Sequence, residues 1–295
     1  MTRDEQMPVI NLDFQTDFRT IAAKALARLD IVLAANEVDN AVYFYCANVR
    51  RRIEARPRRV SEPKDLVCPA HLVIGYAELK SELENGIDVT RRLSRTTKNV
   101  VYEDMMLNDW GILHLHLGIR DARGEVPRTE PVLFALVRDD AVYVIGFFPH
   151  GAWAEIEVLE TVQRNWPHLM EHARVYAVTS YEATSEERAK LRAAGAIILT
   201  NVNGVVYAPP GGGYTRAKTS GTAHKDADRA MIDLEFYEKH VRQNVATFLK
   251  QIDDLGRAAG TPPTFHFWVN EDGNACAMEP TAEVNFILGS FPRLS

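Results

Sequence analysis

The sequence predicts an α+β protein in which N-terminal helices precede an antiparallel meander, and a second α+β unit with a long helix and hairpins follows. Two observations predict this class. Apolar residues recur at helical spacing over 17–33. Short apolar segments bounded by turn residues then follow one another at 112–117, 132–137 and 141–148. Helices ahead of such a meander, with another helix after it, are typical of an α+β unit.

The first half of the chain is expected to supply most of the helices. These are predicted at 17–33, 37–55, 70–85 and 102–108. Pro57 and Pro63 break the chain after the second helix, and Asn85-Gly86 is a typical C-terminal stop for the third. The segment 88–98 is polar and basic without a period, so it is predicted to be a loop.

A helix at 155–166 closes the meander, and a domain boundary is expected near Pro167. The predicted domains are therefore 1–167 and 168–295. The second is expected to contain a strand at 175–179, a helix at 185–194, a hairpin of 197–200 and 205–208, a glycine-rich loop at 209–222, a long helix at 225–256 and a hairpin of 265–269 and 275–278.

The composition is that of an ordinary globular protein, with 46% hydrophobic and 25% charged residues among 295. No apolar run approaches the roughly 18 residues needed to cross a bilayer, and the first residues lack the apolar core of a secretory signal. No membrane association is therefore expected. Cys46, Cys68 and Cys276 are scattered and lack a metal-binding spacing, which favours a reducing, cytoplasmic location.

The net charge of −6 argues against a protein that coats nucleic acid through bulk electrostatics. Basic residues are nevertheless clustered, and a phosphate- or RNA-binding surface is expected at Arg50, Arg51, Arg52, Arg91, Arg92, Arg216 and Lys218. The alternative is that these clusters are solvated helix faces and loops. Cations near the C-terminal end of the helix at 37–55 also suit its dipole without any ligand.

The sharpest chemical signal is the strand predicted at 112–117. Side chains alternate along a strand, so His114 and His116 share one face while Leu113, Leu115 and Leu117 occupy the other. Two steps along the strand place the imidazoles roughly 7 Å apart. The pattern predicts a sheet with a core face and a working face.

His150 follows the third strand of the meander and is expected at the edge of the same face. One histidine would then take the 2′-hydroxyl proton of RNA, and another would protonate the leaving 5′-oxygen, because imidazole titrates near neutral pH. Arg128, in the loop across from the histidine strand, would stabilise the charge on the phosphorus. Such a ribonuclease needs no metal or other cofactor.

Two other interpretations of His114, His116 and His150 remain open. In one, the imidazoles are hydrogen-bonded or stacked structural residues. In the other, His-x-His on one strand and a distant histidine bind Zn²⁺ with an open coordination position for catalysis. The string HLHLG resembles the His-x-His strand of alpha-type carbonic anhydrases, although nothing else in the chain matches that family.

Two neighbouring motifs complete the candidate site. Asp109 and Trp110, directly before the strand, could orient a histidine, or they could be a helix-end residue and a core residue. The loop at 209–222 could cradle an anion, although it contains no nucleotide-binding glycine motif, or it could be a mobile surface loop.

Two helices followed by an antiparallel meander that bears histidine or arginine resemble the RelE/ParE-like bacterial toxins, whose ribonuclease members cleave messenger RNA. The resemblance covers residues 37–153 and is one of architecture. The motif LNDWGILHLHLG also resembles one in an uncharacterised bacterial family.

The sequence therefore predicts a bacterial, metal-independent, ribonuclease-like protein of the toxin or defence type. RNA is its expected partner. The first alternative is a non-catalytic binding or assembly protein with structural histidines, which would bind a protein partner or a second copy of itself. The second is a zinc-dependent hydrolase.

Overall fold

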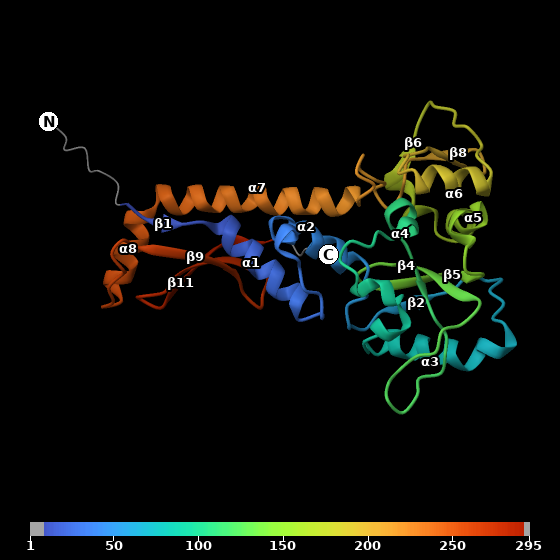
Figure 1. The fold of residues 1–295 in the computed structure, drawn as a ribbon, viewed down its shortest axis with the longest axis horizontal. Helices are drawn as coiled ribbons and strands as arrows, with labels where there is room; N and C mark the ends of the chain where they lie inside the picture. The colour runs from blue at the N-terminus through green and yellow to red at the C-terminus, as the bar shows by residue number, and fades with distance from the viewer. Residues whose placement is uncertain (1–8, 292–295) are drawn as a thin grey trace. The chain divides into compact units, whose positions relative to one another are not determined.

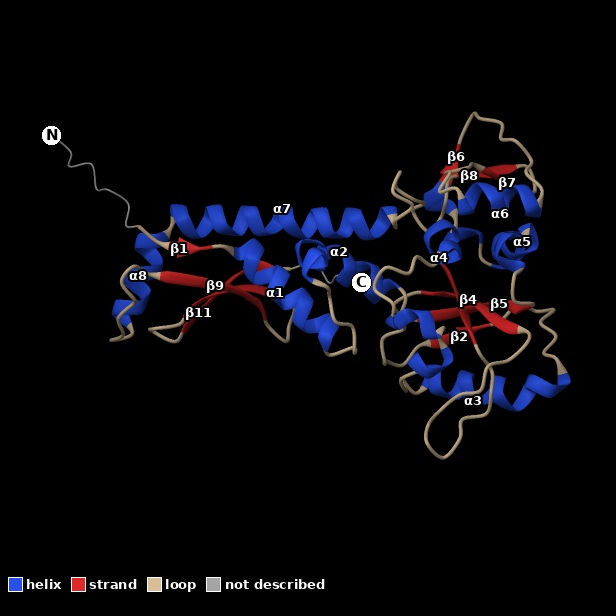
Figure 2. Cartoon of the chain, in the orientation of Figure 1, coloured by secondary structure: helices blue, strands red, loops and turns tan. Residues whose placement is uncertain are grey.

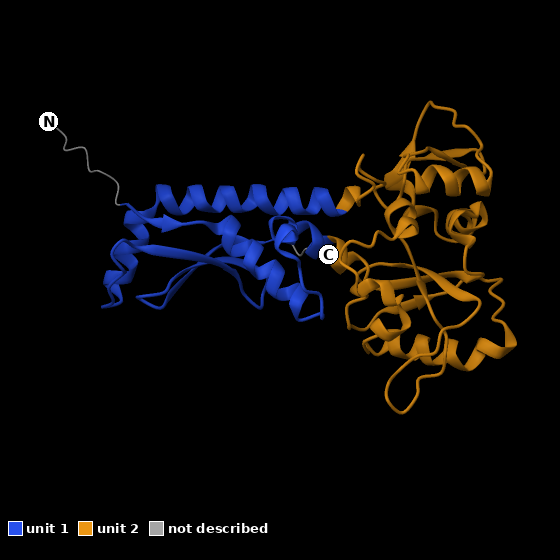
Figure 3. Cartoon of the chain, in the orientation of Figure 1, with its two compact units in different colours: residues 1–46, 223–295 blue, residues 47–222 orange. Residues whose placement is uncertain are grey.

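The computed structural model describes residues 9–291, whose helices and mixed sheets confirm the α+β class (Figures 1 and 2). The chain divides into two compact units (Figure 3). Unit 1 combines residues 1–46 with 223–295, and unit 2 is the continuous segment 47–222. Among the described residues, no helix is both long and apolar enough to span a membrane.

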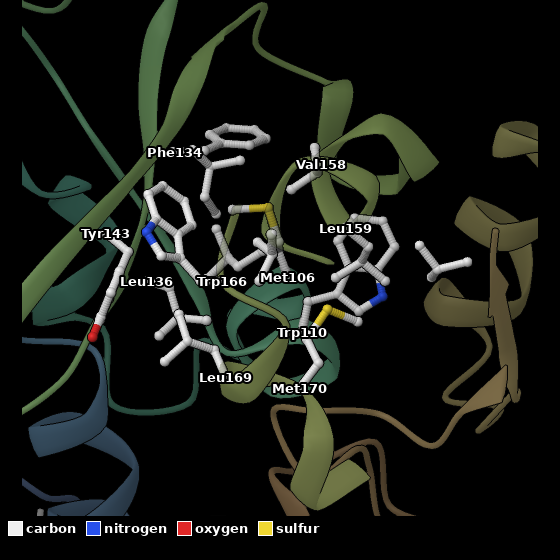
Figure 4. Packing of buried hydrophobic residues seen from close by; sticks show 14 of the residues in the cluster. Met106, Trp110, Phe134, Leu136, Tyr143, Val158, Leu159, Trp166, Leu169 and Met170 are labelled. Carbon is white, nitrogen blue, oxygen red and sulfur yellow. The ribbon is translucent and has the colours of Figure 1, made fainter. Parts of the chain in front are cut away.

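This division differs from the boundary expected near Pro167. One hydrophobic cluster of unit 2 contains Trp110 and Phe134 from before Pro167 together with Leu169, Met170 and Tyr207 from after it (Figure 4). Residues that share one core fold as one unit, so the turn at Pro167 lies inside unit 2 rather than between domains.

The central sheet of unit 2 has four strands. In sheet order they are β2 (Arg59–Ser61), β5 (Ala141–Phe148), β4 (Val132–Val137) and β3 (Ile112–Leu115). β3, β4 and β5 form the predicted antiparallel meander, and β4 and β5 have the predicted bounds. β3 is shorter than predicted, because after Leu115 the backbone N–H of His116 donates to the carbonyl of Arg92 instead of extending the ladder. β2 adds a parallel edge that the sequence analysis missed.

Helices pack against both faces of this sheet. α3 (Val73–Glu84) packs its Leu79 and Leu83 against Leu113 and Leu115 of β3. On the opposite face, a second cluster is formed with α4 (Met105–Trp110) and α5 (Ile156–Asn165) (Figure 4). His114 pairs with Phe134 across β3 and β4 and so lies on this second face.

A smaller three-stranded sheet completes unit 2. Its strands are β6 (Arg174–Val175), β8 (Val205–Tyr207) and β7 (Thr200–Val202). β7 and β8 form the predicted hairpin around Asn203-Gly204, where both residues have positive φ as a tight hairpin turn requires. Before this hairpin, α6 (Ser185–Ala193) begins with a capping box between Thr184 and Glu187.

The glycine-rich loop at 209–222 is anchored to α4. The N–H groups of Gly211 and Gly213 donate to the carbonyls of Asp109 and Asn108. A Cβ built on Gly211 would lie 2.3 Å from the carbonyl oxygen of Leu107, so only glycine permits this approach. These contacts make the loop part of the packed unit instead of a mobile surface loop.

Unit 1 contains a second sheet. Its strands, in sheet order, are β1 (Asn11–Leu12), β9 (Thr264–Val269), β10 (Asn274–Glu279) and β11 (Val284–Ser290). Phe14 of α1 (Phe14–Ala27) packs on Phe267 of β9, with ring centroids 5.6 Å apart. β9 and β10 match the hairpin predicted from the sequence, whereas β1 and β11 were not predicted.

The largest differences from the predicted helices lie in α1, in the helix predicted at 37–55 and in the long helix. α1 begins earlier than expected, because Asp13 caps it by accepting from the N–H of Thr16. The helix predicted at 37–55 is reduced to α2 (Ala41–Arg50). The long helix predicted at 225–256 is two helices, α7 (Gly221–Gln243) and α8 (Val245–Asp254), separated at Asn244.

Candidate functional site

Unit 2 contains a cavity of about 630 Å³ that all three candidate histidines line. The volume falls within the roughly 300–1,000 Å³ typical of small-ligand sites. The cavity is bordered by α4, by the end of β3, by the residues that follow β5 and by α6. The lining side chains with the most relevant chemistry are those of Asp104, His114, His116, Arg128, His150 and Arg192.

The three imidazoles form a cluster. The ring centroids of His114 and His116 are 6.1 Å apart, and those of His114 and His150 are 6.2 Å apart. The rings of His116 and His150 are stacked, with centroids 5.3 Å apart. β3 supplies His114 and, just beyond its end, His116, while the turn after β5 supplies His150. The meander therefore brings together the residues that its strand order predicted.

His116 is the most buried of the three, with 2% of its surface exposed. Its Nδ1 accepts a hydrogen bond from the backbone N–H of Thr129 at 3.1 Å. Burial, with the charge of Arg128 as the next cause, lowers the pKa of His116 to about 3. The ring is therefore neutral at neutral pH.

His114 is partly buried in the same cavity, against the ring of Trp153 at 4.9 Å. Burial lowers the pKa of His114, and the neighbouring His150 and Arg128 lower it further, while the carboxylate of Asp104 opposes them. Asp104 is itself held in place as the N-cap of α4, where it accepts from the N–H of Leu107. A neutral His114 can accept a proton from a ligand.

His150 is exposed and is paired with Glu130, a residue that the sequence analysis missed. Glu130 accepts from the backbone N–H of His150 at 2.8 Å, and its Oε2 lies 2.6 Å from Nδ1 of the same ring. Hydrogen bonds from His150 are the main cause that lowers the pKa of Glu130, so the carboxylate is ionised. The hairpin register could have indicated this pair, because the β4–β5 pairing of Val132 with Phe148, continued by two pairs, places 130 opposite 150.

Arg128 supplies positive charge to the cavity. One of its guanidinium nitrogens donates to the carbonyl of Leu93 at 3.0 Å, and its side chain is otherwise largely exposed. Burial is the main cause that lowers the pKa of Arg128, and the charge of Arg95 adds to it, but an arginine stays protonated in such surroundings. The predicted position of Arg128 near the histidines agrees with its place in the cavity lining.

Asp109 and Trp110 do not orient a histidine. Asp109 is buried and pairs with Arg192 of α6 at 2.7 Å and 3.0 Å. Trp110 lies in the core, and the guanidinium carbon of Arg192 stands 4.3 Å from its ring centroid. The two residues therefore hold Arg192, which itself lines the cavity and which the sequence analysis did not identify.

Two of the predicted nucleic-acid-binding arginines are structural instead. Arg51 is buried and donates to the carbonyls of Ala47, Asn99 and Tyr102. Arg92 is completely buried and is bound to Glu82 and to the carbonyl of Gly118. A phosphate cannot reach these guanidinium groups, because the chain already surrounds them.

The other predicted basic residues make separate contacts. Arg50 donates to Ser220 and to the carbonyl of Gly211, and so fastens the glycine-rich loop. Arg52 bonds to Asn48, and Arg91 forms an exposed ion pair with Glu125 at 2.8 Å. Lys218 and Arg216 are both exposed, and Lys218 donates to the carbonyl of Ala193.

Metal binding was the alternative role of the three histidines. Across residues 9–291, no group of three or more His, Cys, Asp or Glu side chains is arranged to hold a metal ion. Nδ1 of His116 is engaged by Thr129, which would leave only Nε2 of that ring for ligation.

Comparisons with family models, with curated proteins and with solved structures gave no match for this chain.

Proposed function

We propose that unit 2 is a metal-independent, ribonuclease-like domain of the toxin or defence type that cleaves single-stranded RNA by acid–base catalysis. The observation that carries this proposal is the placement of His114 and His150 in one cavity, 6.2 Å apart, beside the guanidinium of Arg128. Two imidazoles at this separation can flank one phosphodiester, with one ring near the attacking oxygen and the other near the leaving oxygen.

His114 is assigned as the general base. It is the partly buried ring whose pKa is lowered, so it is neutral near pH 7 and can take the proton of the 2′-hydroxyl. The 2′-oxygen then attacks phosphorus, and charge develops on the non-bridging oxygens. Arg128 lies beside this position and stabilises that charge.

His150 is assigned as the general acid. The ionised carboxylate of Glu130 at Nδ1 orients the ring, as a carboxylate does in a catalytic triad. As the bond between phosphorus and the 5′-oxygen breaks, Nε2 of His150 gives its proton to that oxygen. The products are a 2′,3′-cyclic phosphate and a free 5′-hydroxyl, and the two proton transfers balance.

The size of the cavity favours an unpaired substrate. A volume of about 630 Å³ accommodates a ligand of nucleotide size but not a duplex. Single-stranded segments expose their bases and their 2′-hydroxyl groups to such a site.

The test is cleavage of a labelled single-stranded RNA in the presence of EDTA. We expect cleavage by the wild type and a loss of at least about 100-fold in His114→Gln and His150→Gln, the scale of acid–base catalysis. His168→Gln, an exposed histidine of unit 2 outside the cavity, should retain full activity. A single 2′-deoxy substitution at the cleaved position should block the reaction. Intact RNA with correctly folded wild type would overturn the proposal, as would normal growth on expression.

The non-catalytic alternative is supported by one specific observation. His116 is buried and bound to backbone, as a structural histidine would be. If the wild type leaves RNA intact, pull-down of a protein partner or a defined oligomer in light scattering would favour a binding or assembly role. Stoichiometric zinc in elemental analysis, with activity lost in EDTA, would instead favour the hydrolase.

A further inference from the structure

The hydrogen bond between Thr129 and His116 determines which nitrogen of that ring carries the proton. A backbone N–H can only donate, so Nδ1 of His116 is an acceptor and has no proton. A neutral imidazole without a proton on Nδ1 carries it on Nε2. His116 therefore presents a permanent Nε2–H donor. The low pKa of the ring, about 3, is consistent with this single form over the physiological range.

This Nε2–H has no acceptor among the described residues, although the side chain is only 2% exposed and lines the cavity. The recorded hydrogen bonds of His116 involve its backbone and Nδ1. The Nε2 atom is not among the buried polar atoms that lack a partner, and the residue lines the cavity, so this donor is open to the cavity, where a bound ligand can accept its hydrogen bond.

Arg128 brings a second donor to the same place through the chain itself. It directly precedes Thr129, so one short segment both fixes the ring of His116 and positions the guanidinium. The guanidinium has five N–H groups, and its recorded hydrogen bond to Leu93 engages one nitrogen. Arg128 lines the same cavity as His114 and His116, and its charge contributes to the lowered pKa of both rings.

We propose that Nε2–H of His116 and the guanidinium of Arg128 form an anion subsite that binds a non-bridging oxygen of a phosphodiester, and that His116 transfers no proton. The identification of this anion as the scissile phosphate rests on the proposed ribonuclease function. A neutral donor and a fixed cation are complementary to a phosphoryl oxygen and act without reorganisation as charge develops.

The carboxylates near the subsite favour a diester over a phosphomonoester. Asp104 lines the cavity and interacts with His114, while Glu130 contacts His150. Both repel additional negative charge. A phosphodiester carries one negative charge, whereas a phosphomonoester carries close to two at pH 7. The subsite should therefore bind the diester more tightly.

The test uses a 2′-deoxydinucleotide, which contains the phosphodiester but lacks the attacking hydroxyl. Binding is followed by titration calorimetry and by ¹⁵N NMR of the histidine side chains in the full chain. We expect His116 to show the Nε2–H form between pH 5 and pH 8, and its Nε2 signal to shift when the dinucleotide binds. A mononucleotide 5′-phosphate should bind several-fold more weakly.

Two substitutions of His116 separate its two nitrogens. His116→Asn keeps an acceptor for the N–H of Thr129 but lacks the distal donor, and it should weaken dinucleotide binding by about 10-fold. His116→Gln retains a distal N–H, and its binding should remain within about threefold of the wild type. Arg128→Gln should also weaken binding by about 10-fold, whereas Arg91→Gln, at the exposed pair with Glu125, should not.

The outcomes distinguish this inference from the function on which it rests. Binding as predicted without RNA cleavage would leave the subsite standing and overturn the ribonuclease. Cleavage and binding unaffected in a folded His116→Asn would overturn the subsite alone. A proton on Nδ1 in the NMR spectrum, or a failure of the dinucleotide to bind the wild type, would also overturn it.

Discussion

Glu130 and His150 face each other where the β4–β5 hairpin opens, with Oε2 of the carboxylate 2.6 Å from Nδ1 of the ring. The second carboxylate oxygen accepts from the backbone N–H of His150, so the pair is bound at two points. Carboxylate and imidazole are in this way aligned before any ligand arrives.

Glu130→Gln keeps the side chain's shape but removes its charge. Without the carboxylate, the ring of His150 loses its ionic partner and is less well oriented, so we expect kcat for RNA cleavage to fall by about 10- to 100-fold with little change in KM. The loss should be smaller than in a buried triad, because both side chains are exposed. Glu171→Gln, which alters an exposed pair with Arg174, is the control. Equal activity of the two variants would remove Glu130 from the mechanism.

The pH dependence of cleavage should report His114. A base is active once it has lost its proton, and the pKa of His114 lies below its ordinary 6.5, so the rising limb of kcat/KM should lie below pH 6.5. Asp104→Asn removes the charge that raises this pKa and should move the limb to lower pH, while asparagine preserves the cap of α4. Asp121→Asn should leave the limb in place. A limb that moves upward in Asp104→Asn would contradict the assignment of the base.

Acid stability should depend on His116. Its pKa is about 3 in the folded chain against an ordinary 6.5, so between these values the unfolded chain binds more protons. The free energy of unfolding therefore decreases as the pH falls from 6.5 towards 3, by up to about 4 kcal/mol from this residue. The asparagine of His116→Asn does not titrate in this pH range. The free energy of unfolding of this variant should therefore decrease less steeply as the pH falls. Urea unfolding of the wild type and of His116→Asn at pH 7, 5 and 4 measures this difference. If the free energy of unfolding falls equally with pH in both proteins, the prediction is refuted.

The buried pair of Asp109 and Arg192 should be essential to unit 2. Arg192→Met leaves the carboxylate of Asp109 without its cation, and we expect a loss of about 3–5 kcal/mol in the free energy of unfolding. Replacing both residues, as in Asp109→Leu with Arg192→Met, should recover part of that loss. Arg174→Met, from an exposed pair, should change stability by less than about 1 kcal/mol. Additive single losses in the double variant would show that the two residues are not coupled.

Local patterns were sufficient for most elements of the meander. β4 and β5 have the predicted bounds, because an apolar run between turn residues leaves little choice of where a strand begins or ends. The same reasoning overextended the helix at 225–256, since the apolar period continues across Asn244, where the backbone departs from helical geometry. β1 and β2 were missed because strands of two or three residues carry almost no period.

The site was predicted only in part for a related reason. Alternation along β3 was enough to place His114 and His116 on one face, and the strand order brought His150 towards them. The hydrogen-bond partners of these rings could not be predicted from the sequence. Thr129, for example, contributes a backbone N–H, which no side-chain motif reveals. Arg51 and Arg92 appeared to be surface cations because sequence shows charge but not burial.

By itself, the sequence determined the α+β class, the meander and the histidine strand, because hydrophobic periodicity and turn residues act over a few neighbouring positions. Tertiary structure alone decided that the chain divides into a continuous unit at 47–222 and a unit made from its two ends. It also decided that Asp109 holds Arg192, and that the backbone N–H of Thr129 donates to Nδ1 of His116. These outcomes depend on burial and on contacts between residues far apart in the chain, and local patterns do not encode such contacts.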